Sequence, residues 1–371
     1  MNIGIDGRIL DWKYSGIAKY VQLMLTFDFF KGATVYFPAK TNCQLPDGFK
    51  KKVLKNPFKR REAYEQFILP FHLAKDKIDL FIQPYNFGIP VLYFGKSILL
   101  VFDIIPLVFN NYFFYARFPK WARWNYKINT EIAIWRSTKI ICDSNAAKQH
   151  LLSYFPRINK DKLDHIYYGF QKLDFADQFS FVRFKKEKRI GEKYLLANAG
   201  LEERKNAHLL IDAFTKIPPQ LTSGLQLVFT GYNPHYLKQL TKIVEKNSLQ
   251  DKVIFTDSIT EGEKNLLIKK SLCVINPSQL EGFGIPLLEA AYFVRPIICS
   301  DIPAFVEVGQ EYPIYFKNND EADLIDKISY LLKNLTAEEK RAKEKSAGML
   351  ERFTYEKMRD KWRKIITEQR K

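Results

Sequence analysis

The sequence has 371 residues, 46% hydrophobic and 27% charged, which is long enough for two globular cores of about 170–190 residues each. Its apolar runs are too short to cross a bilayer, and its first six residues lack the pattern of a signal peptide. The formal net charge of +17 exceeds what solubility requires. It favours an anionic partner: a nucleotide, an anionic membrane surface or a nucleic acid.

The cysteines and histidines indicate a reduced protein without a metal centre. Cys43, Cys142, Cys273 and Cys299 stand singly, and at least three of them lie in apolar runs typical of strands. We therefore expect reduced core residues of a cytoplasmic protein. The 5 histidines form no ligand-spaced cluster, and the sequence contains no Asp-x-Asp, so it offers no dedicated metal site.

The first half alternates apolar runs with helical patterns. A first strand is predicted over residues 2–9, followed by a polar loop that ends at Gly16 and a helix from Ile17 to about Phe30. A second helix is predicted near residues 62–73. Further strands are predicted at Thr34–Phe37, Asp79–Ile82, Ser97–Phe102, Lys139–Asp143 and Leu163–Tyr167. Strands joined by helices indicate a doubly wound parallel sheet.

The stretch from Asn110 to Arg136 is both aromatic and basic. Trp121, Trp124 and Ile128 recur at helical spacing, which is typical of a stripe that faces a core. The alternative is a surface that touches anionic lipid, with aromatic rings at the interface and cations at the headgroups. The sequence leaves both interpretations open.

A change of pattern divides the chain. Residues 173–192 lose their periodicity and become highly charged, which predicts a linker. An N-terminal domain is then expected over residues 1–172, a C-terminal domain over residues 193–354 and a last helix over residues 355–371. The second domain repeats the α/β plan.

The C-terminal half contains a second series of strands and helices. Strands are predicted at Tyr194–Ala199, Leu225–Thr230, Val253–Phe255, Leu272–Asn276, Pro296–Ser300 and Pro313–Phe316. Long helices are predicted from Glu321 to Asn334 and from Ala337 to Arg352. These elements indicate a second parallel sheet covered by helices.

Two adjacent cations follow the first strand of this half. Arg204 and Lys205 lie at a strand-to-helix turn, and Asn206 is expected to cap the helix that follows. A guanidinium donates two parallel hydrogen bonds to a phosphate, and an ammonium supplies a point charge. The pair is a candidate phosphate clamp, although an exposed Arg-Lys pair also occurs as a plain solvated face.

A second strand-to-helix turn runs from Asn276 to Glu289. In an open α/β sheet such a turn lies at the carboxyl edge, where the start of a helix attracts an anion. Gly282 and Gly284 allow a ligand to approach the backbone closely. Two carboxylates, Glu281 in the loop and Glu289 in the helix, suit the hydroxyls of a nucleotide sugar.

These two turns carry a family resemblance. Residues 277–290 read Pro-Ser-Gln-Leu-Glu-Gly-Phe-Gly-Ile-Pro-Leu-Leu-Glu-Ala and closely resemble the Glu-x7-Glu motif of the retaining GT-B glycosyltransferases. Residues 199–206 resemble the string Gly-x-Leu-Glu-Pro-Arg-Lys-Asn, by which that family holds the donor diphosphate. Ala199 and Glu203 replace its first Gly and its Pro.

Two segments of the first half extend the resemblance. Residues 102–107 are similar to the family's His-Asp-x-Ile-Pro-Leu segment, with Phe102 in place of His. Residues 14–20, which include Gly16, resemble the Gly-Ile-x-Arg-Tyr segment, with Lys19 where Arg is usual. The resemblance therefore covers nearly the whole chain.

The resemblance implies an α/β fold of the GT-B type, in which two doubly wound Rossmann-like domains face a central cleft. The first domain would bind the acceptor, the second the nucleotide sugar, and the last helix would cross back onto the first domain. The implied reaction moves a sugar from a nucleotide-diphosphate sugar to a hydroxyl of a glycan or lipid-linked glycan, with retention, in surface polysaccharide or glycoconjugate synthesis. Neither a metal nor another cofactor is expected.

The resemblance also implies residue roles. Arg204 and Lys205 would stabilise the departing diphosphate, with Glu281 beside the transferred sugar. Asp103 would orient the acceptor or support the charge at the reacting carbon. Phe102 offers no hydrogen-bond donor, which favours a donor without a sixth hydroxyl, a 6-deoxy sugar or a pentose. The alternative is that the Phe102 ring only packs and the backbone keeps the contact to the sugar. Donor contacts are expected from Gly16, Phe102, Ser258, Gly282, Phe283, Gly284, Ile285 and Glu289.

Two other classes of protein stay open. A GT-B epimerase or phosphorylase shares the fold, but no segment supplies paired acid/base carboxylates at the hexose or a lysine for pyridoxal phosphate. A non-catalytic basic protein that binds membrane or RNA would not need the two glutamates and the Arg-Lys pair together. We expect a cytoplasmic enzyme that lies peripherally on the inner face of the membrane and has no nucleic-acid partner.

Overall fold

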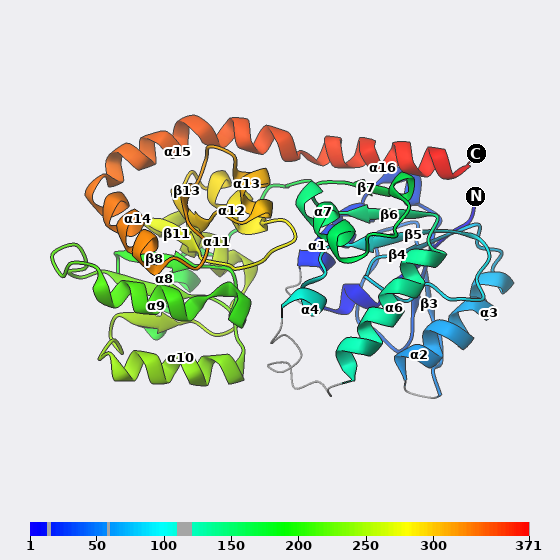
Figure 1. The fold of residues 1–371 in the computed structure, drawn as a ribbon, viewed down its shortest axis with the longest axis horizontal. Helices are drawn as coiled ribbons and strands as arrows, with labels where there is room; N and C mark the ends of the chain where they lie inside the picture. The colour runs from blue at the N-terminus through cyan, green and yellow to red at the C-terminus, as the bar shows by residue number, and fades with distance from the viewer. Residues whose placement is uncertain (13–15, 58–59, 110–120, 371) are drawn as a thin grey trace. The chain divides into compact units, whose positions relative to one another are not determined.

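The computed structural model describes residues 1–12, 16–57, 60–109 and 121–370. The chain divides into two compact units. Unit 1 comprises Met1–Gly169 and Phe353–Lys371, and unit 2 comprises Phe170–Arg352. Each unit contains one sheet of parallel strands with helices packed on it (Figure 1).

The sheet of unit 1 has the strand order β3-β2-β1-β4-β5-β6-β7. Its strands are β1 (Ile3–Asp6), β2 (Thr34–Phe37), β3 (Lys50–Val53), β4 (Leu80–Gln83), β5 (Lys96–Val101), β6 (Lys139–Cys142) and β7 (Leu163–His165). The strand β3 was not predicted, because it is an edge strand whose lysines are mostly exposed. The strand order reverses between β1 and β4, which makes their carboxyl ends the switch point of this sheet.

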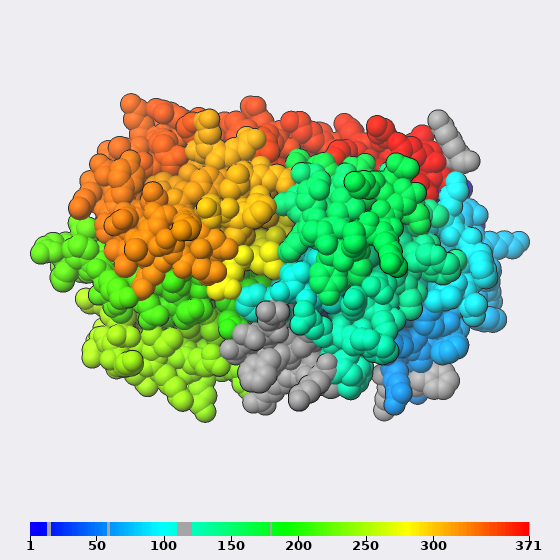
Figure 2. Space-filling view, in the orientation of Figure 1, coloured from blue at the N-terminus to red at the C-terminus, as the bar shows by residue number. Residues whose placement is uncertain are grey.

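Helices on both faces complete unit 1. They are α1 (Gly16–Met24), α2 (Arg61–Ala63), the π-helical turn η3 (Tyr64–Ile68), α3 (Leu69–Lys75), α4 (Ile105–Val108), α6 (Ala122–Arg136), α7 (Asn145–Tyr154) and α16 (Tyr355–Arg370). Short 3-10 turns occur at η1 (Arg8–Asp11), η2 (Asp28–Phe30) and η4 (Lys160–Lys162). Helix α6 lies at the surface of unit 1, where Figure 2 shows it in teal.

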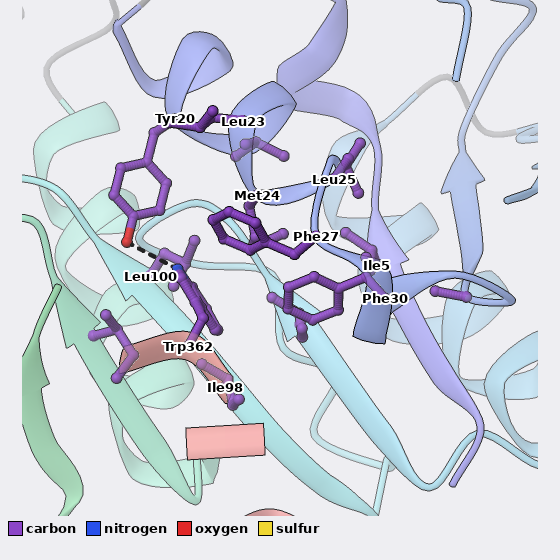
Figure 3. Close-up of a cluster of buried hydrophobic side chains, with 14 of the residues drawn as sticks. Ile5, Tyr20, Leu23, Met24, Leu25, Phe27, Phe30, Ile98, Leu100 and Trp362 are labelled. Carbon is purple, nitrogen blue, oxygen red and sulfur yellow. Dashed lines mark hydrogen bonds between the residues drawn. The ribbon is translucent and has the colours of Figure 1, made fainter. Parts of the chain in front are cut away.

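The last helix, α16, is built into the core of unit 1. Its Trp362 is fully buried, and the indole Nε1 donates a hydrogen bond to the Tyr20 hydroxyl over 3.2 Å (Figure 3). The Tyr20 hydroxyl in turn donates to the backbone oxygen of Ile166 over 3.2 Å. Phe27 and Phe30, which follow α1, pack in the same cluster. A segment from the end of the chain therefore completes the core around the first helix.

The sheet of unit 2 has the strand order β10-β9-β8-β11-β12-β13. Its strands are β8 (Tyr194–Ala197), β9 (Gln226–Phe229), β10 (Val253–Phe255), β11 (Cys273–Asn276), β12 (Ile297–Ser300) and β13 (Ile314–Phe316). Both β8 and β11 are buried along their whole length, as expected for central strands of a parallel sheet. The switch point of unit 2 lies between these two strands.

The helices of unit 2 flank this sheet. They are α8 (Gln178–Glu187), the 3-10 turn η5 (Glu203–Lys205), α9 (Ala207–Lys216), α10 (Pro234–Lys246), α11 (Glu261–Lys270), α12 (Ile285–Tyr292), α13 (Pro303–Gly309), α14 (Glu321–Lys333) and α15 (Leu335–Leu350). The 3-10 turn η6 (Glu351–Phe353) follows this series and contains the boundary at which the chain returns to unit 1. Among the described residues, no helix is both long and apolar enough to span a bilayer.

The linker predicted over residues 173–192 is replaced by structure that belongs to unit 2. Helix α8 lies within it, and the side chain of Asp177 caps this helix by accepting a hydrogen bond of 2.9 Å from the Ser180 amide. Phe181 and Phe184 lie three residues apart on one face of the helix and are both buried. The helix was not predicted, because this apolar stripe is short and lies in a highly charged segment.

Candidate active site

The two strand-to-helix turns meet at the switch point of unit 2. The turn with Arg204 and Lys205 follows β8, and the turn with Glu281 follows β11. Because β8 and β11 are hydrogen-bonded neighbours, both turns leave the same edge of the sheet. The Gln279 amide also donates a hydrogen bond of 2.8 Å to the Arg204 carbonyl. This edge is where open α/β sheets bind their ligands.

Glu281 joins the two cations into one cluster. Arg204 Nη1 donates a hydrogen bond of 2.8 Å to Glu281 Oε2, and Lys205 Nζ pairs with Glu281 Oε1. The Ser278 hydroxyl donates to the same Oε1 over 2.9 Å. Arg204 Nε donates a further bond of 2.9 Å to Glu202 Oε2. Carboxylates therefore position both cations in this structure.

Burial and the neighbouring charges shift the pKa values of side chains in this cluster. Burial by itself would raise the pKa of Glu281, but the charges of Arg204 and Lys205 outweigh burial and lower that pKa to about 2. Burial, followed by the neighbouring Arg204 charge, lowers the pKa of Lys205. Glu281 is consequently ionised throughout the neutral range. An added anionic group would favour the charged form of Lys205.

The turn before α12 depends on a glycine for its backbone shape. Gly284 has φ of 126°, and a Cβ there would lie 3.0 Å from the Phe305 ring. Pro286 stands in the first turn of the helix, where its missing N–H costs nothing. Gly282 and Phe283 are buried. Helix packing therefore requires Gly284, beyond the close ligand approach that the sequence suggested.

Asn206 does not cap α9 with its side chain. It occupies the N-cap position in a left-handed conformation, with φ of 59°, and makes no side-chain bond to the helix. Its Nδ2 donates instead to Asn319 Oδ1 over 2.9 Å. The predicted capping role is wrong, because the tight 3-10 turn η5 before Asn206 turns the amide toward a distant loop.

Glu289, on α12, belongs to a second cluster of hydrogen-bonded polar side chains. The residue is only 3% exposed, and its Oε2 accepts a hydrogen bond of 3.0 Å from Asn198 Nδ2. Its Oε1 accepts one of 2.6 Å from Lys264 Nζ, which also pairs with Glu261 at 2.8 Å. Burial would lower the pKa of Lys264, but the two glutamates outweigh it and raise that pKa.

Asn198 and Lys264 are partners that sequence reasoning missed. Asn198 stands directly after the buried strand β8, and a polar residue at the carboxyl end of such a strand is a usable signal. Lys264 lies in α11, where it is one cation among several. Nothing in its local pattern distinguishes it, since its partner Glu289 comes from another helix.

The other predicted donor contacts of unit 2 are more scattered. Ser258 is exposed on the loop after β10, two strands away from β8. Ile285 begins α12 and is half-buried. The loops after β8 and β9 meet closely, since a Cβ at Gly231 would lie 2.8 Å from Gly200 Cα. The Gly231 amide also donates to the Asp257 carbonyl over 3.2 Å.

Three predicted site residues belong to unit 1. Gly16 is the exposed first residue of α1, and Tyr14 and Ser15 before it lie outside the described residues. Phe102 is buried after β5, and its ring meets that of Tyr20 edge-on at 4.9 Å. Asp103 Oδ1 accepts a hydrogen bond of 3.0 Å from the Ile105 amide.

The burial of Phe102 gives its aromatic ring a packing role. Its ring belongs to the core cluster around Tyr20 and Trp362, which accounts for an apolar side chain at this position. The preference for a donor without a sixth hydroxyl stays a prediction.

Within the described ranges, no group of three or more His, Cys, Asp or Glu side chains is arranged to hold a metal ion.

A family comparison agrees with this geometry. Residues 178–349 match the family model of the glycosyl transferases group 1. The match contains both strand-to-helix turns, with the Arg204–Lys205 pair and both glutamates. Unit 2 is therefore similar, over nearly its whole length, to the glycosyl transferases group 1.

Two relatives of known function are named as O-antigen enzymes. The chain is 28% identical over 233 residues to the O-antigen chain mannosyltransferase RfbU of Salmonella typhimurium, covering 63% of this chain and 59% of that protein. It is 28% identical over 215 residues to the O-antigen biosynthesis glycosyltransferase WclY of Escherichia coli, covering 57% and 58% respectively. The chain thus spans less than two thirds of the length of each of these relatives.

Solved structures of the same fold cover the whole chain. Anabaena HepE in complex with UDP and glucose superposes with a TM-score of 0.78 at 15% identity, over 99% of this chain and 100% of that one. WaaG, a glycosyltransferase involved in lipopolysaccharide biosynthesis, has a TM-score of 0.75 at 15% identity, with the same two coverages. The prediction of two doubly wound Rossmann-like domains of the GT-B type is confirmed.

Proposed function

We propose that the protein transfers a sugar from a nucleotide-diphosphate sugar to a hydroxyl of a glycan or lipid-linked glycan, with retention of the anomeric configuration. The observation that carries the proposal is the cluster of Arg204, Lys205 and Glu281 at the switch point beside the start of α12. The names of RfbU and WclY support a role in O-antigen or a similar surface polysaccharide. The HepE complexes support a nucleotide sugar as donor.

The proposed chemistry depends on stabilising the leaving group. When the bond from sugar to phosphate breaks, negative charge grows on the diphosphate, and Arg204, Lys205 and the amides at the start of α12 would bind it. The cations are already ordered by Glu281, so little reorganisation is needed in the transition state. They also supply the charge neutralisation that a metal provides elsewhere. The proposed reaction is therefore metal-independent and needs no added cofactor.

The remaining polar groups have roles in the same proposal. The acceptor attacks the face from which the diphosphate leaves, and the leaving phosphate takes the acceptor's proton, so no covalent nucleophile is required. Glu281 would lie beside the sugar, and Glu289 would accept hydrogen bonds from the ribose diol while Asn198 and Lys264 hold it. Asp103 of unit 1 would orient the acceptor or support positive charge on the sugar.

A thermal-shift screen of the full chain tests this function. We expect one of UDP, GDP or dTDP, free or as a sugar conjugate, to raise the melting temperature, because a ligand at 100 times its Kd stabilises a protein by about 2.7 kcal/mol. The matching nucleotide sugar should then release nucleotide when a glycan acceptor is added. If none of the three nucleotides shifted melting, the proposed function would be wrong. A change of the sugar without any acceptor would favour an epimerase. Formation of a sugar 1-phosphate from a glycan and phosphate, without any nucleotide, would favour a phosphorylase.

Unit 1 also presents an aromatic and basic surface on α6. Trp121, Trp124 and Trp135 are 62%, 68% and 69% exposed, so the prediction that the first two face a core is wrong. Ile128 is half-buried. Residues 110–120 of the predicted stretch lie outside the described residues.

Cations accompany the exposed rings of this α6 surface. Arg136 Cζ lies 5.4 Å from the Trp135 ring and 5.3 Å from the ring of Phe94, which is itself 82% exposed. Arg123 and Lys127 are exposed on the same helix. Exposed aromatic rings interleaved with cations suit the interface of an anionic bilayer. We propose that this surface holds the enzyme peripherally on the cytoplasmic face of a membrane.

Sedimentation with vesicles tests the membrane surface. The protein is expected to bind vesicles with anionic lipid at low salt and to leave them at about 1 M salt, where the screening length is only about 3 Å. Each well-placed cation contributes up to about 1 kcal/mol. The double variant W124A/W135A should bind several-fold more weakly, whereas Tyr232→Ala, which removes an exposed ring of unit 2, should bind normally. Failure of the unaltered protein to bind at low salt would contradict the proposal.

A further inference from the structure

A buried serine lies behind the carboxylate of the candidate site. Ser278 comes two residues after the end of β11, and its side chain is fully buried. Its Oγ lies 2.9 Å from Glu281 Oε1 and 2.7 Å from Oδ1 of Asn276, which is also fully buried. A hydroxyl carries a single proton, so Ser278 donates to one of these two acceptors at a time. A charged acceptor forms the stronger bond, which favours donation to Glu281.

The backbone around Ser278 is held by contacts that do not use its hydroxyl. Ser300 ends β12, the neighbour of β11 in the sheet, and its Oγ donates a hydrogen bond to the Ser278 carbonyl. The next residue, Gln279, donates its amide to the Arg204 carbonyl over 2.8 Å. Loss of the Ser278 hydroxyl would therefore leave this loop attached to the sheet and to the other turn.

Two of the partners of Glu281 are the cations assigned to the diphosphate. Arg204 Nη1 donates to Oε2 over 2.8 Å, and Lys205 Nζ pairs with Oε1. A bound diphosphate carries more negative charge than one carboxylate and would draw both cations toward itself. Ser278 is different, because its buried side chain has no access to a ligand. Its bond to Glu281 is therefore the one that remains when the donor is bound.

A carboxylate that gives up two cations needs another donor. The side chain of Glu281 is only 12% exposed. Burial raises its pKa, and Arg204 and Lys205 lower it. Without any partner, such a carboxylate would take up a proton or turn toward water. A hydrogen bond from Ser278 favours the ionised form and fixes Oε1, so that Oε2, which faces Arg204 in this structure, is left to accept a hydroxyl of the sugar.

We propose that Ser278 is a positioning residue, which holds Glu281 in place for the sugar once the donor diphosphate has taken the two cations. This inference rests on the proposed function and adds to it a residue that touches neither donor nor acceptor. Ser278 acts through Glu281 alone, and Asn276 lies against the other side of its hydroxyl. The bond matters most in the complex with the nucleotide sugar, since the cations hold Glu281 before the donor binds.

A kinetic double-mutant cycle on the full chain tests this role. Ser278→Ala should lower kcat roughly ten- to hundredfold, the range expected for a hydrogen bond to a charged group, with a smaller change in KM for the donor. Calorimetry should show the affinity for the free nucleotide unchanged within about twofold, because Glu281 is assigned to the sugar. In the background of Glu281→Ala, adding Ser278→Ala should change kcat by less than about twofold, because Ser278 then has nothing to position.

The matched control is Ser300→Ala. This change removes an equally buried hydroxyl that contacts the same loop, but it leaves the bond from Ser278 to Glu281. Its kcat should stay within about threefold of that of the unaltered protein, the effect of a bond that does not reach the carboxylate. Ser278→Cys keeps a weak donor at the same place and should transfer at an intermediate rate. It takes the place of Ser278→Ala in the cycle if melting shows that the alanine variant is unfolded.

The outcomes separate this inference from the proposed function. A normal kcat in Ser278→Ala, an equal loss in Ser300→Ala, or a further loss when Ser278→Ala is added to Glu281→Ala would each overturn the positioning role. If the unaltered protein binds no nucleotide or transfers no sugar, the proposed function fails and the role of Ser278 fails with it. If transfer occurs and only Glu281→Ala impairs it, the role of Ser278 alone is wrong.

Discussion

Replacing Arg204 with alanine is expected to lower the turnover of sugar transfer by roughly two to three orders of magnitude, the usual cost of losing a charged donor to developing negative charge. Lys205→Ala should have a similar effect. Both variants should stay folded, because Glu281 pairs with both cations and keeps one partner after either change. Turnover is measured as nucleotide release with the nucleotide sugar identified by thermal shift.

The control for this experiment is Arg183→Ala. Arg183 lies on α8 of the same unit and is largely exposed, and its side chain pairs with Glu187 four residues along the helix. Removing such a pair changes stability by about 0.3–0.5 kcal/mol and should not affect transfer. A near-normal rate in Arg204→Ala or in Lys205→Ala would remove that residue from the diphosphate clamp.

The two glutamates are expected to separate catalysis from binding. Glu281→Ala leaves the two cations side by side without the carboxylate that orders them, so transfer should fall about 100-fold or more, with a smaller change in nucleotide affinity. Glu289→Ala should chiefly weaken nucleotide binding, by about 1.5–3 kcal/mol, through loss of hydrogen bonds from the ribose diol. Calorimetry with the free nucleotide and steady-state kinetics measure the two effects.

The burial of Glu289 requires a second variant. Glu289→Ala leaves the Lys264 amine without one of its two carboxylate partners, so lower stability accompanies the loss of affinity. Glu289→Gln preserves the shape of the side chain. If its melting temperature stays near that of the unaltered protein, its loss of nucleotide affinity comes from the lost carboxylate and not from unfolding. A larger loss of nucleotide affinity in Glu281→Ala than in Glu289→Gln would contradict the placement of the two carboxylates.

Local patterns predicted most of the secondary structure. The strands Thr34–Phe37 and Val253–Phe255 were predicted residue for residue, because short apolar runs between turns are typical of buried parallel strands. Charged or exposed elements were missed. The edge strand β3 is rich in lysine, and the buried face of α8 consists of few apolar residues in a charged segment.

For the candidate site, the sequence predicted the residues and did not predict the contacts between them. Arg204, Lys205, Glu281 and Glu289 each stand at a strand-to-helix turn or in the helix after it, and such turns can be read from neighbouring residues. The contacts between these four residues cannot be read from the sequence in this way. Arg204 and Glu281 are 77 residues apart, and they meet because β8 and β11 are neighbours in the sheet. The pairing of Glu289 with Lys264 likewise depends on the packing of two helices.

The sequence by itself therefore determined the doubly wound plan, the two turns and the residue types at them, since all three follow from periodicity and spacing along the chain. Tertiary structure alone decided the direction of Trp121 and Trp124, because helical spacing shows which residues share a face and does not show what that face meets. It also formed a cavity of about 450 Å³ in unit 1, whose walls come from segments as distant as Trp12, Arg61 and Asn125. Strand order brings such segments together, and strand order is a property of the whole fold.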